Sequence, residues 1–176
     1  MKILMERRPQ IIMSLGIFFT NYFLDRFTKY IAVEFLKGNG SISFFNNKFV
    51  LVYAENTGAF LSLGRNWSIY AKYAVLLIIP IFICITGLLY LMVKEEKKYR
   101  IIICSCIIGG GIGNLVDRLF NEFTVIDFMN FGIGKIRTGI LNVADISVTF
   151  GIIILIIFEM IQSKQVTAHE DSSHSR

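Results

Sequence analysis

The chain has 176 residues, of which 54% are hydrophobic, and its mean hydropathy is +0.59. This composition excludes an ordinary soluble domain of the same length. The net charge of +5 does not indicate nucleic-acid binding, because the basic residues flank apolar runs, as they do in membrane proteins. The composition therefore predicts an integral membrane protein in contact with lipids, with one domain over residues 1–164.

Four apolar runs approach the roughly 20 residues that a helix needs to cross a bilayer. They cover about residues 11–35, 69–93, 101–120 and 140–161. We expect an all-α membrane protein with four transmembrane helices. The first run follows a charged head like a secretory signal, but no small-residue cleavage site follows it, so we expect an uncleaved span. Residues 165–176 are polar, and we expect a disordered cytoplasmic tail.

Residues 38–66, between the first two runs, are too polar to span a membrane. Two short stretches rich in aromatic and β-branched residues flank the polar turn Asn46-Asn47-Lys48, which predicts a small β element on the membrane surface. The short loop over residues 94–100 is the most basic loop of the chain. Because cytoplasmic loops carry an excess of basic residues, both termini are predicted to be cytoplasmic and the β element extracytoplasmic.

Charged residues within the apolar runs are costly in hydrocarbon and need a partner or a function. Asp25 and Lys29 are four residues apart, so they share a helix face and can pair. Asn114, Asp117 and Arg118 share a face near the end of the third run. We interpret Asp117 as a structural partner of Asn114 and Arg118.

One helix face in the third run is almost without side chains because it carries four glycines, Gly109, Gly110, Gly111 and Gly113. This predicts close packing against another helix. A phosphate-binding loop does not fit, because no strand precedes them. The three cysteines lie inside apolar runs and are interpreted as small buried residues. No metal or cofactor is expected.

Asp127 and Asp145 are the candidate catalytic residues. Both have apolar neighbours, and Asn142 lies three residues before Asp145. Burial and a nearby second carboxylate both raise the pKa of a carboxyl group, so two aspartates can share a proton. Such a pair can activate water against an amide and protonate the leaving nitrogen. The spacing alone leaves open that the two aspartates act separately, one on a loop and one at a helix end.

Other protease chemistries fit less well. His169 and His174 lie in the polar tail, one residue too far apart for a zinc-binding HExxH motif. The sequence has no further histidine for a serine or cysteine nucleophile. Asn56, in the segment Asn56-Thr-Gly, can orient a substrate backbone through its amide, or it can simply form a turn.

Together these segments resemble the bacterial lipoprotein signal peptidase family (signal peptidase II). The similar pieces occur in the family's order and cover the chain up to its tail. They are Asp25-Arg-Phe-Thr-Lys29, Asn56-Thr-Gly-Ala-Phe60, Gly109-Gly-Gly-Ile-Gly-Asn-Leu-Val-Asp-Arg118, Val125-Ile-Asp-Phe128 and Asn142-Val-Ala-Asp145. Gly111 stands where many relatives carry alanine.

The resemblance implies an aspartyl endopeptidase of the bacterial cytoplasmic membrane, with its active site near the extracytoplasmic face. It implies cleavage of diacylglyceryl-modified prolipoproteins just before the lipidated cysteine, inhibition by the cyclic peptide globomycin, and a monomer. Asp127 and Asp145 match the family's catalytic pair. Residues that match supporting or substrate-contacting positions are Asp25, Lys29, Asn56, Gly110, Asn114, Asp117, Arg118, Asn142 and Ala144.

Two alternatives remain at this point. One is a non-enzymatic four-span membrane protein, such as a proton-coupled transporter subunit that uses Asp117, Asp127 and Asp145 as a relay. The other is a different intramembrane aspartyl protease, although its usual Gly-x-Gly-Asp signature is absent from the sequence.

Overall fold

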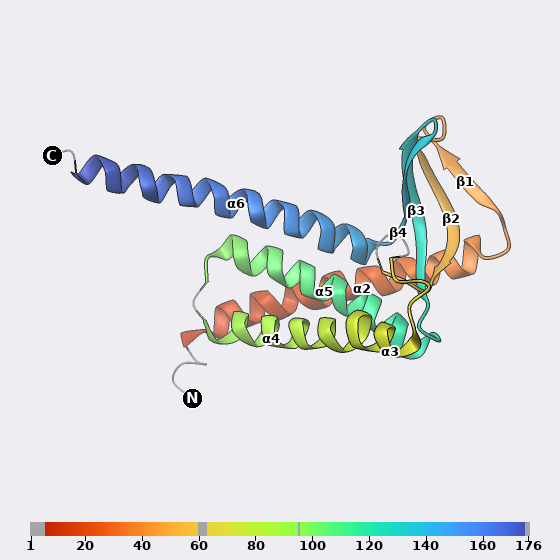
Figure 1. The fold of residues 1–176 in the computed structure, drawn as a ribbon, viewed down its shortest axis with the longest axis horizontal. Helices are drawn as coiled ribbons and strands as arrows, with labels where there is room; N and C mark the ends of the chain where they lie inside the picture. The colour runs from red at the N-terminus through yellow and green to blue at the C-terminus, as the bar shows by residue number, and fades with distance from the viewer. Residues whose placement is uncertain (1–5, 60–62, 95, 175–176) are drawn as a thin grey trace.

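The computed structural model describes residues 6–59, 63–94 and 96–174, with side chains as far as Ser163. Four long helical segments run side by side, and a β-sheet stands across one end of them (Figure 1). The helices are α2 (Arg8–Leu36), α3 (Ile69–Lys72), α4 (Ile79–Val93), α5 (Lys98–Phe120) and α6 (Val143–His174), with the π-helix η2 (Tyr73–Ile78) between α3 and α4.

Helix α5 is the centre of the bundle, and it packs against α2, α4 and α6. Small residues allow this close packing. A methyl group added at Gly109 would lie 2.6 Å from the carbonyl oxygen of Phe18 in α2, and one added at Gly110 would lie 3.0 Å from that of Ala144 in α6. The predicted packing role of these glycines is therefore confirmed.

The segment leading into α4 contains a wide helical turn. Pro80 lacks an N–H group and its ring crowds the carbonyl of the preceding turn. The π-helix η2 lies immediately before it. Helical structure continues from Ile69 to Val93 because the wider turn accommodates the proline.

The sheet has four antiparallel strands in the order β1-β2-β3-β4. The strands are β1 (Ser41–Phe44), β2 (Phe49–Asn56), β3 (Val125–Ile133) and β4 (Ile136–Leu141). The first two come from the segment between α2 and α3, and the last two from the segment between α5 and α6. The central β2–β3 pairing aligns Ala54 with Asp127 and Asn56 with Val125, so it joins chain segments far apart in sequence.

The prediction of an all-α protein with four transmembrane helices is wrong. Residues 125–139, expected to be a loop, form β3 and most of β4, and β4 ends at Leu141, inside the expected fourth span. Three of the described helices are long and apolar enough to cross a membrane: Ile69–Val93, Lys98–Phe120 and Val143–Ser163. Helix α2 has the length but carries Asn21, Asp25, Arg26 and Lys29, which lower its hydropathy. The proposed disorder of residues 165–176 stays a prediction, since the side chains there lie outside the described part.

Candidate active site

The two candidate catalytic aspartates lie where the sheet meets the helix ends. Asp127 is on β3 and is 2% exposed, whereas Asp145 is half-buried in the first turn of α6. Neighbouring strand β2 brings Asn56 to Asp127, and the Asn56 Nδ2 atom donates to Asp127 Oδ2 at 3.0 Å. Strand pairing therefore determines one side of the site.

Asn142 connects the two aspartates. Its Nδ2 atom donates to Asp127 Oδ1 at 2.6 Å, and its backbone N–H donates to Asp145 Oδ2 at 3.2 Å. The Asp145 backbone N–H donates in return to Asn142 Oδ1 at 2.9 Å. This reciprocal pattern at the start of α6 is that of a capping box, which satisfies backbone N–H groups that the helix leaves free. The helix cap and the link between the aspartates are thus made by the same residue.

Asn114 of α5 completes the ring of amides around the pair. Its Nδ2 atom donates to Asp145 Oδ1 at 2.9 Å, while its Oδ1 atom accepts from Asn142 Nδ2 at 3.1 Å and from Lys29 Nζ at 2.8 Å. Each aspartate therefore accepts hydrogen bonds on both oxygens, which fixes its orientation.

Beneath this ring lies a buried ion cluster. Lys29 is 1% exposed, and its Nζ atom lies 2.8 Å from Asp25 Oδ2, 2.8 Å from Asp117 Oδ2 and 2.8 Å from Asn114 Oδ1. Lys29 therefore forms ion pairs with two buried carboxylates and donates a hydrogen bond to Asn114. The predicted Asp25–Lys29 pair is confirmed, but it is one part of a network that spans α2 and α5.

The prediction that Asp117 pairs with Arg118 is wrong. Asp117 instead forms ion pairs with Arg26 and Lys29. The Arg118 guanidinium donates to the Gly58 carbonyl at 3.0 Å and the Asn114 carbonyl at 3.4 Å. A residue and its immediate neighbour point to different sides of a helix, which explains the error. Arg26 was missed as a site-supporting residue.

Two further predicted positions support the site through backbone packing. The Ala144 N–H donates to Asp25 Oδ1 at 2.9 Å, so the buried acid of α2 holds the start of α6. A methyl group added at Gly113 would fall on the Asp25 carboxylate. Gly110 is where α5 approaches Ala144 and Ser147. All eleven residues named from the sequence thus lie in this region, and Asn21, which accepts from the Ser147 hydroxyl at 2.9 Å, extends it.

Burial raises the pKa of Asp127, and the nearby negative charge of Asp145 raises it further, to about 7. Hydrogen bonds from Asn56 and Asn142 oppose the rise because they favour the ionised carboxylate. A carboxyl group that holds its proton near neutral pH beside a second carboxylate suits general acid–base catalysis. Among the described residues, no group of three or more histidine, cysteine or acidic side chains is arranged to hold a metal ion.

The fold and the site define an integral membrane protein with an amide-bridged pair of carboxylates, one buried and one half-buried. Comparison with known proteins agrees with this class. The model of the signal peptidase (SPase) II family matches residues 17–161. A lipoprotein signal peptidase from Borrelia hermsii is 34% identical, covering 91% of this chain and 96% of its own. One from Borreliella afzelii is 37% identical, covering 78% and 83%.

Solved structures agree with the sequence matches. A bacterial membrane enzyme determined at 2.3 Å superposes with a TM-score of 0.73 at 25% identity, covering 86% of this chain and 90% of that one. A second, determined at 1.9 Å, has a TM-score of 0.69 at 26% identity. The chain belongs to the signal peptidase II family and is a membrane peptidase. This membership argues against the alternative of a non-enzymatic transporter subunit.

Proposed function

We propose that the chain is a lipoprotein signal peptidase that uses Asp127 and Asp145 as an aspartyl dyad. Its substrates are diacylglyceryl-modified prolipoproteins, cut just before the lipidated cysteine. Family membership supports the substrate class. The observation that carries the mechanism is Asn142, whose amide and backbone N–H contact the two carboxylates at 2.6 and 3.2 Å.

The mechanism requires one proton on the pair. With the pKa of Asp127 at about 7, we assign that proton to Asp127. Asp145 takes a proton from water, the resulting hydroxide attacks the scissile carbonyl carbon, and Asp127 protonates the carbonyl oxygen. When the intermediate collapses, the proton held by Asp145 passes to the leaving nitrogen and the oxygen returns its proton to Asp127. The titration belongs to the pair as a whole.

The remaining predicted residues position this pair. Lys29, Asp25 and Asp117 hold Asn114 and the start of α6, so they are positioning residues. Asn56 and Asn142 hold Asp127. Arg118 reaches the Gly58 carbonyl beside the dyad, where it fixes the turn that follows β2.

We infer an orientation in the bacterial cytoplasmic membrane from the arrangement of the chain and the positions of its basic residues. The start of α2, the α4–α5 connection and the far end of α6 lie at one end of the molecule, and the sheet lies at the other (Figure 1). The α4–α5 connection carries Lys94, Lys97 and Lys98. Because basic connections stay in the cytoplasm, the end of the molecule that carries the α4–α5 connection is cytoplasmic and the dyad faces the extracytoplasmic side.

Cleavage of a defined lipidated precursor by the protein in lipid nanodiscs tests the proposal. Asp127→Asn and Asp145→Asn variants are expected to insert and fold but to lose cleavage, whereas Glu55→Gln, an exposed acid on the same sheet, retains it. Normal cleavage by either dyad variant would refute the mechanism. Globomycin is expected to inhibit the active forms, and the enzyme is expected to work as a monomer.

The pH dependence gives a second, independent test. Because the active pair holds one proton, kcat/KM is expected to fall as the pH rises through about 7. Asn56→Ala removes a hydrogen bond that favours ionised Asp127. The basic limb of the kcat/KM profile of this variant is therefore expected to move up by about one pH unit, the equivalent of roughly 1.4 kcal/mol. An unchanged limb would contradict the role assigned to Asn56.

A further inference from the structure

A pocket separate from the dyad lies between α2, α5 and the sheet, and we call it the back pocket. Its volume is about 350 Å³. Glu55 and Ile126, which are paired across β2 and β3, both line it. Successive residues of a strand point to opposite faces of a sheet, so Asp127, which follows Ile126, points to the other face. The back pocket and the dyad therefore lie on opposite sides of the sheet.

The charged side chains that line the back pocket balance one another. Arg26 of α2 forms an ion pair with Asp117 of α5. Lys37, which follows α2, donates to Glu55 of β2 at 3.1 Å. The two cations and the two carboxylates sum to zero. A ligand with one negative and one positive group can therefore pair with charges of both signs without adding a net charge.

Arg26 and Lys37 provide the donors for a phosphate group. A guanidinium has five N–H donors, and among the described residues the hydrogen-bond partner of Arg26 is Asp117, through one nitrogen. The Arg26 side chain is 34% exposed and that of Lys37 is 56% exposed, so both are accessible. Arginine binds phosphate through two parallel hydrogen bonds, and lysine binds it as a point charge.

The same pocket provides a place for an ammonium group. The Glu55 side chain is 51% exposed, and it accepts from the Tyr53 hydroxyl at 2.7 Å. The Lys37 ammonium already lies 5.1 Å from the centre of the Tyr53 ring, which shows that a cation fits over this ring. A second ammonium group can therefore pair with the exposed Glu55 carboxylate beside Tyr53.

An exposed apolar surface leads from the back pocket along α2. A row of α2 residues alternates spacings of four and three, which places them on one face of the helix. Phe19 and Phe23 in this row are 48% and 62% exposed, and their rings stack 6.1 Å apart. From Arg26 to Phe19 the helix extends about 10 Å, less than the roughly 15 Å of hydrocarbon in one leaflet. The residues of this row are Phe19, Phe23, Arg26, Tyr30, Val33 and Lys37.

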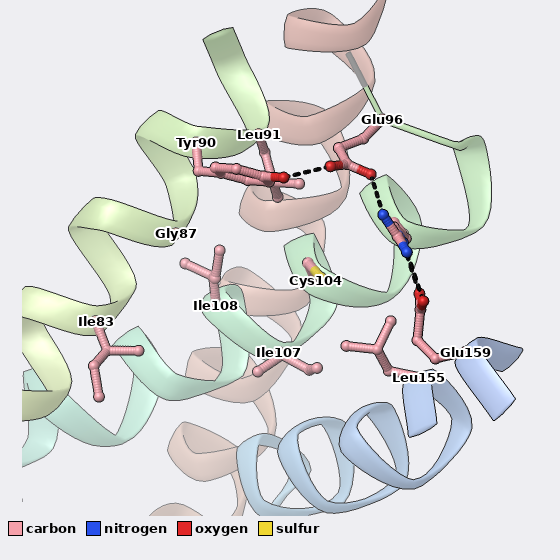
Figure 2. Close-up of a pocket in the computed structure, with 11 residues that line it drawn as sticks. Ile83, Gly87, Tyr90, Leu91, Glu96, Cys104, Ile107, Ile108, Leu155 and Glu159 are labelled. Carbon is pink, nitrogen blue, oxygen red and sulfur yellow. Dashed lines mark hydrogen bonds and ion pairs between the residues drawn. The ribbon is translucent and has the colours of Figure 1, made fainter. Parts of the chain in front are cut away.

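The pocket between α4, α5 and α6 provides a comparison (Figure 2). Its volume is also about 350 Å³, and Ile83 of α4 belongs to its largely apolar lining. All three guanidinium nitrogens of Arg100 donate to carboxylates there, to Glu96 at 3.0 Å and to Glu159 at 2.5 and 2.6 Å. Arg100 is therefore committed to protein partners, whereas Arg26 uses a single nitrogen.

We propose that the back pocket binds the headgroup of a zwitterionic phospholipid. The phosphate lies against Arg26 and Lys37, the ammonium lies against Glu55, and an acyl chain follows the exposed row of α2 into the leaflet. Asp117, the partner of Arg26, also accepts from the Ile126 N–H at 3.4 Å. The bound lipid thus joins α2, α5 and the sheet at the end of the bundle that carries the dyad. This inference is independent of the proposed function, because lipid binding is measured without cleavage.

Retention of lipid by the purified chain tests the site. The full chain is reconstituted in nanodiscs that contain equal amounts of phosphatidylethanolamine and phosphatidylglycerol, and it is then released into detergent for native mass spectrometry. We expect it to retain phosphatidylethanolamine in preference. Lys37→Gln is expected to reduce this retention by up to about five-fold, the range of an exposed ion pair. Lys135→Gln, at an exposed cation in the β3–β4 turn, is expected to leave it unchanged.

Filling the pocket gives a second variant. Val33→Trp keeps all four charged side chains but occupies the space between them, so selective retention is expected to be lost. Lys37→Gln alters an exposed side chain and keeps the test decisive if Val33→Trp does not insert. Equal retention of the two phospholipids by the unaltered chain, or retention that neither variant reduces, would overturn the proposal.

A photoreactive lipid locates the acyl chain. Phosphatidylethanolamine with a diazirine in its acyl chain is irradiated with the protein in nanodiscs, and the labelled peptides are sequenced. Labelling is expected on the α2 segment that contains Phe19 and Phe23, and Lys37→Gln is expected to reduce it several-fold. Labelling near Ile83 of α4 is expected to be unaffected by this variant. An α2 label that Lys37→Gln leaves unchanged would identify lipid that merely surrounds the protein and would refute the site.

Soluble compounds distinguish a lipid from other sources of the same chemistry. Glycerophosphoethanolamine carries the headgroup without acyl chains, and inorganic phosphate carries the anion alone. At millimolar concentration neither is expected to displace the retained lipid or to reduce the α2 label, because both lack the contacts along Phe19 and Phe23. Displacement by either compound would assign the back pocket to a soluble phosphate compound and overturn its assignment to a phospholipid.

Discussion

Buried Asp127 carries a stability cost that can be measured without any substrate. The folded state raises the pKa of Asp127 from an ordinary value of 3.8 to about 7, mainly through burial. Each pKa unit is worth about 1.4 kcal/mol, so ionised Asp127 lowers the free energy of unfolding by about 4 kcal/mol at pH 8. Asp127→Asn removes this cost, and we expect the variant to be the more stable protein above pH 7.

Proton binding to Asp127 determines whether the free energy of unfolding rises or falls with pH. Between about pH 4 and pH 7 the folded state holds a proton on Asp127 that the unfolded state has released. Stability therefore falls as the pH rises through this window and is constant with respect to Asp127 above it. An asparagine does not titrate, so the variant lacks this fall.

The hydrogen bonds around Asp127 reduce the stabilisation expected from Asp127→Asn. Both of its oxygens accept from amide donors, Asn142 Nδ2 at 2.6 Å and Asn56 Nδ2 at 3.0 Å. An asparagine keeps one acceptor and turns its own donor toward the other amide, which costs about 1–2 kcal/mol. The expected net stabilisation at pH 8 is about 2–3 kcal/mol. At pH 4 the variant is expected to be slightly less stable than the wild type.

Reversible unfolding in mixed micelles, followed by the fluorescence of Trp67, measures the difference. The quantity compared is the change in unfolding free energy between pH 4 and pH 8, from which the pH-independent hydrogen-bond penalty cancels. A wild-type protein and an Asp127→Asn variant with parallel pH profiles would refute the reasoning, because Asp127 would then titrate alike in the folded and unfolded states.

Two further predictions concern the packing beneath the dyad. Gly113→Ala is expected to destabilise the protein by about 2 kcal/mol or more, since the added methyl group displaces the Asp25 carboxylate. The control is Gly16→Ala in α2, where the added methyl group meets nothing within 4 Å. This variant is expected to be neutral or slightly stabilising in the same unfolding assay. Lys29→Met leaves two buried carboxylates without their cation and is expected to cost about 3–5 kcal/mol. Lys37→Met breaks an exposed pair and is expected to cost no more than about 1 kcal/mol; equal losses for the two lysines would contradict the burial argument.

Local patterns in the sequence predicted the parts of the site that local physics determines. The i,i+4 spacing of Asp25 and Lys29 gave an ion pair that the structure contains. The spacing of Asn142 and Asp145 predicted a shared face, and the structure contains a reciprocal cap there. The catalytic assignment of the two aspartates was suggested by their apolar neighbours, was strengthened by the family resemblance, and stays a proposal.

Non-local pairing explains what the sequence did not reveal. Strand β3 is held by β2, which lies some seventy residues earlier, and no local pattern specifies that partner. The tight turn at Gly134, with a positive φ of 57°, indicates a hairpin in retrospect. Likewise, Asp117 finds Arg26 on another helix, whereas sequence proximity favoured Arg118. A signal for Arg26 existed in its position beside the polar row of Asn21, Asp25 and Lys29.

The composite sheet also determines when a newly made enzyme becomes active. Asn56 and Asp127, which touch across β2 and β3, are 71 residues apart in the chain. At a synthesis rate of roughly 5–20 residues per second, the second strand follows the first by about 4–14 seconds. During that interval the first strand pair has no partner, and the carboxylate pair does not exist. Under the proposed mechanism, the chain is therefore expected to be inactive until its last helix has begun to form.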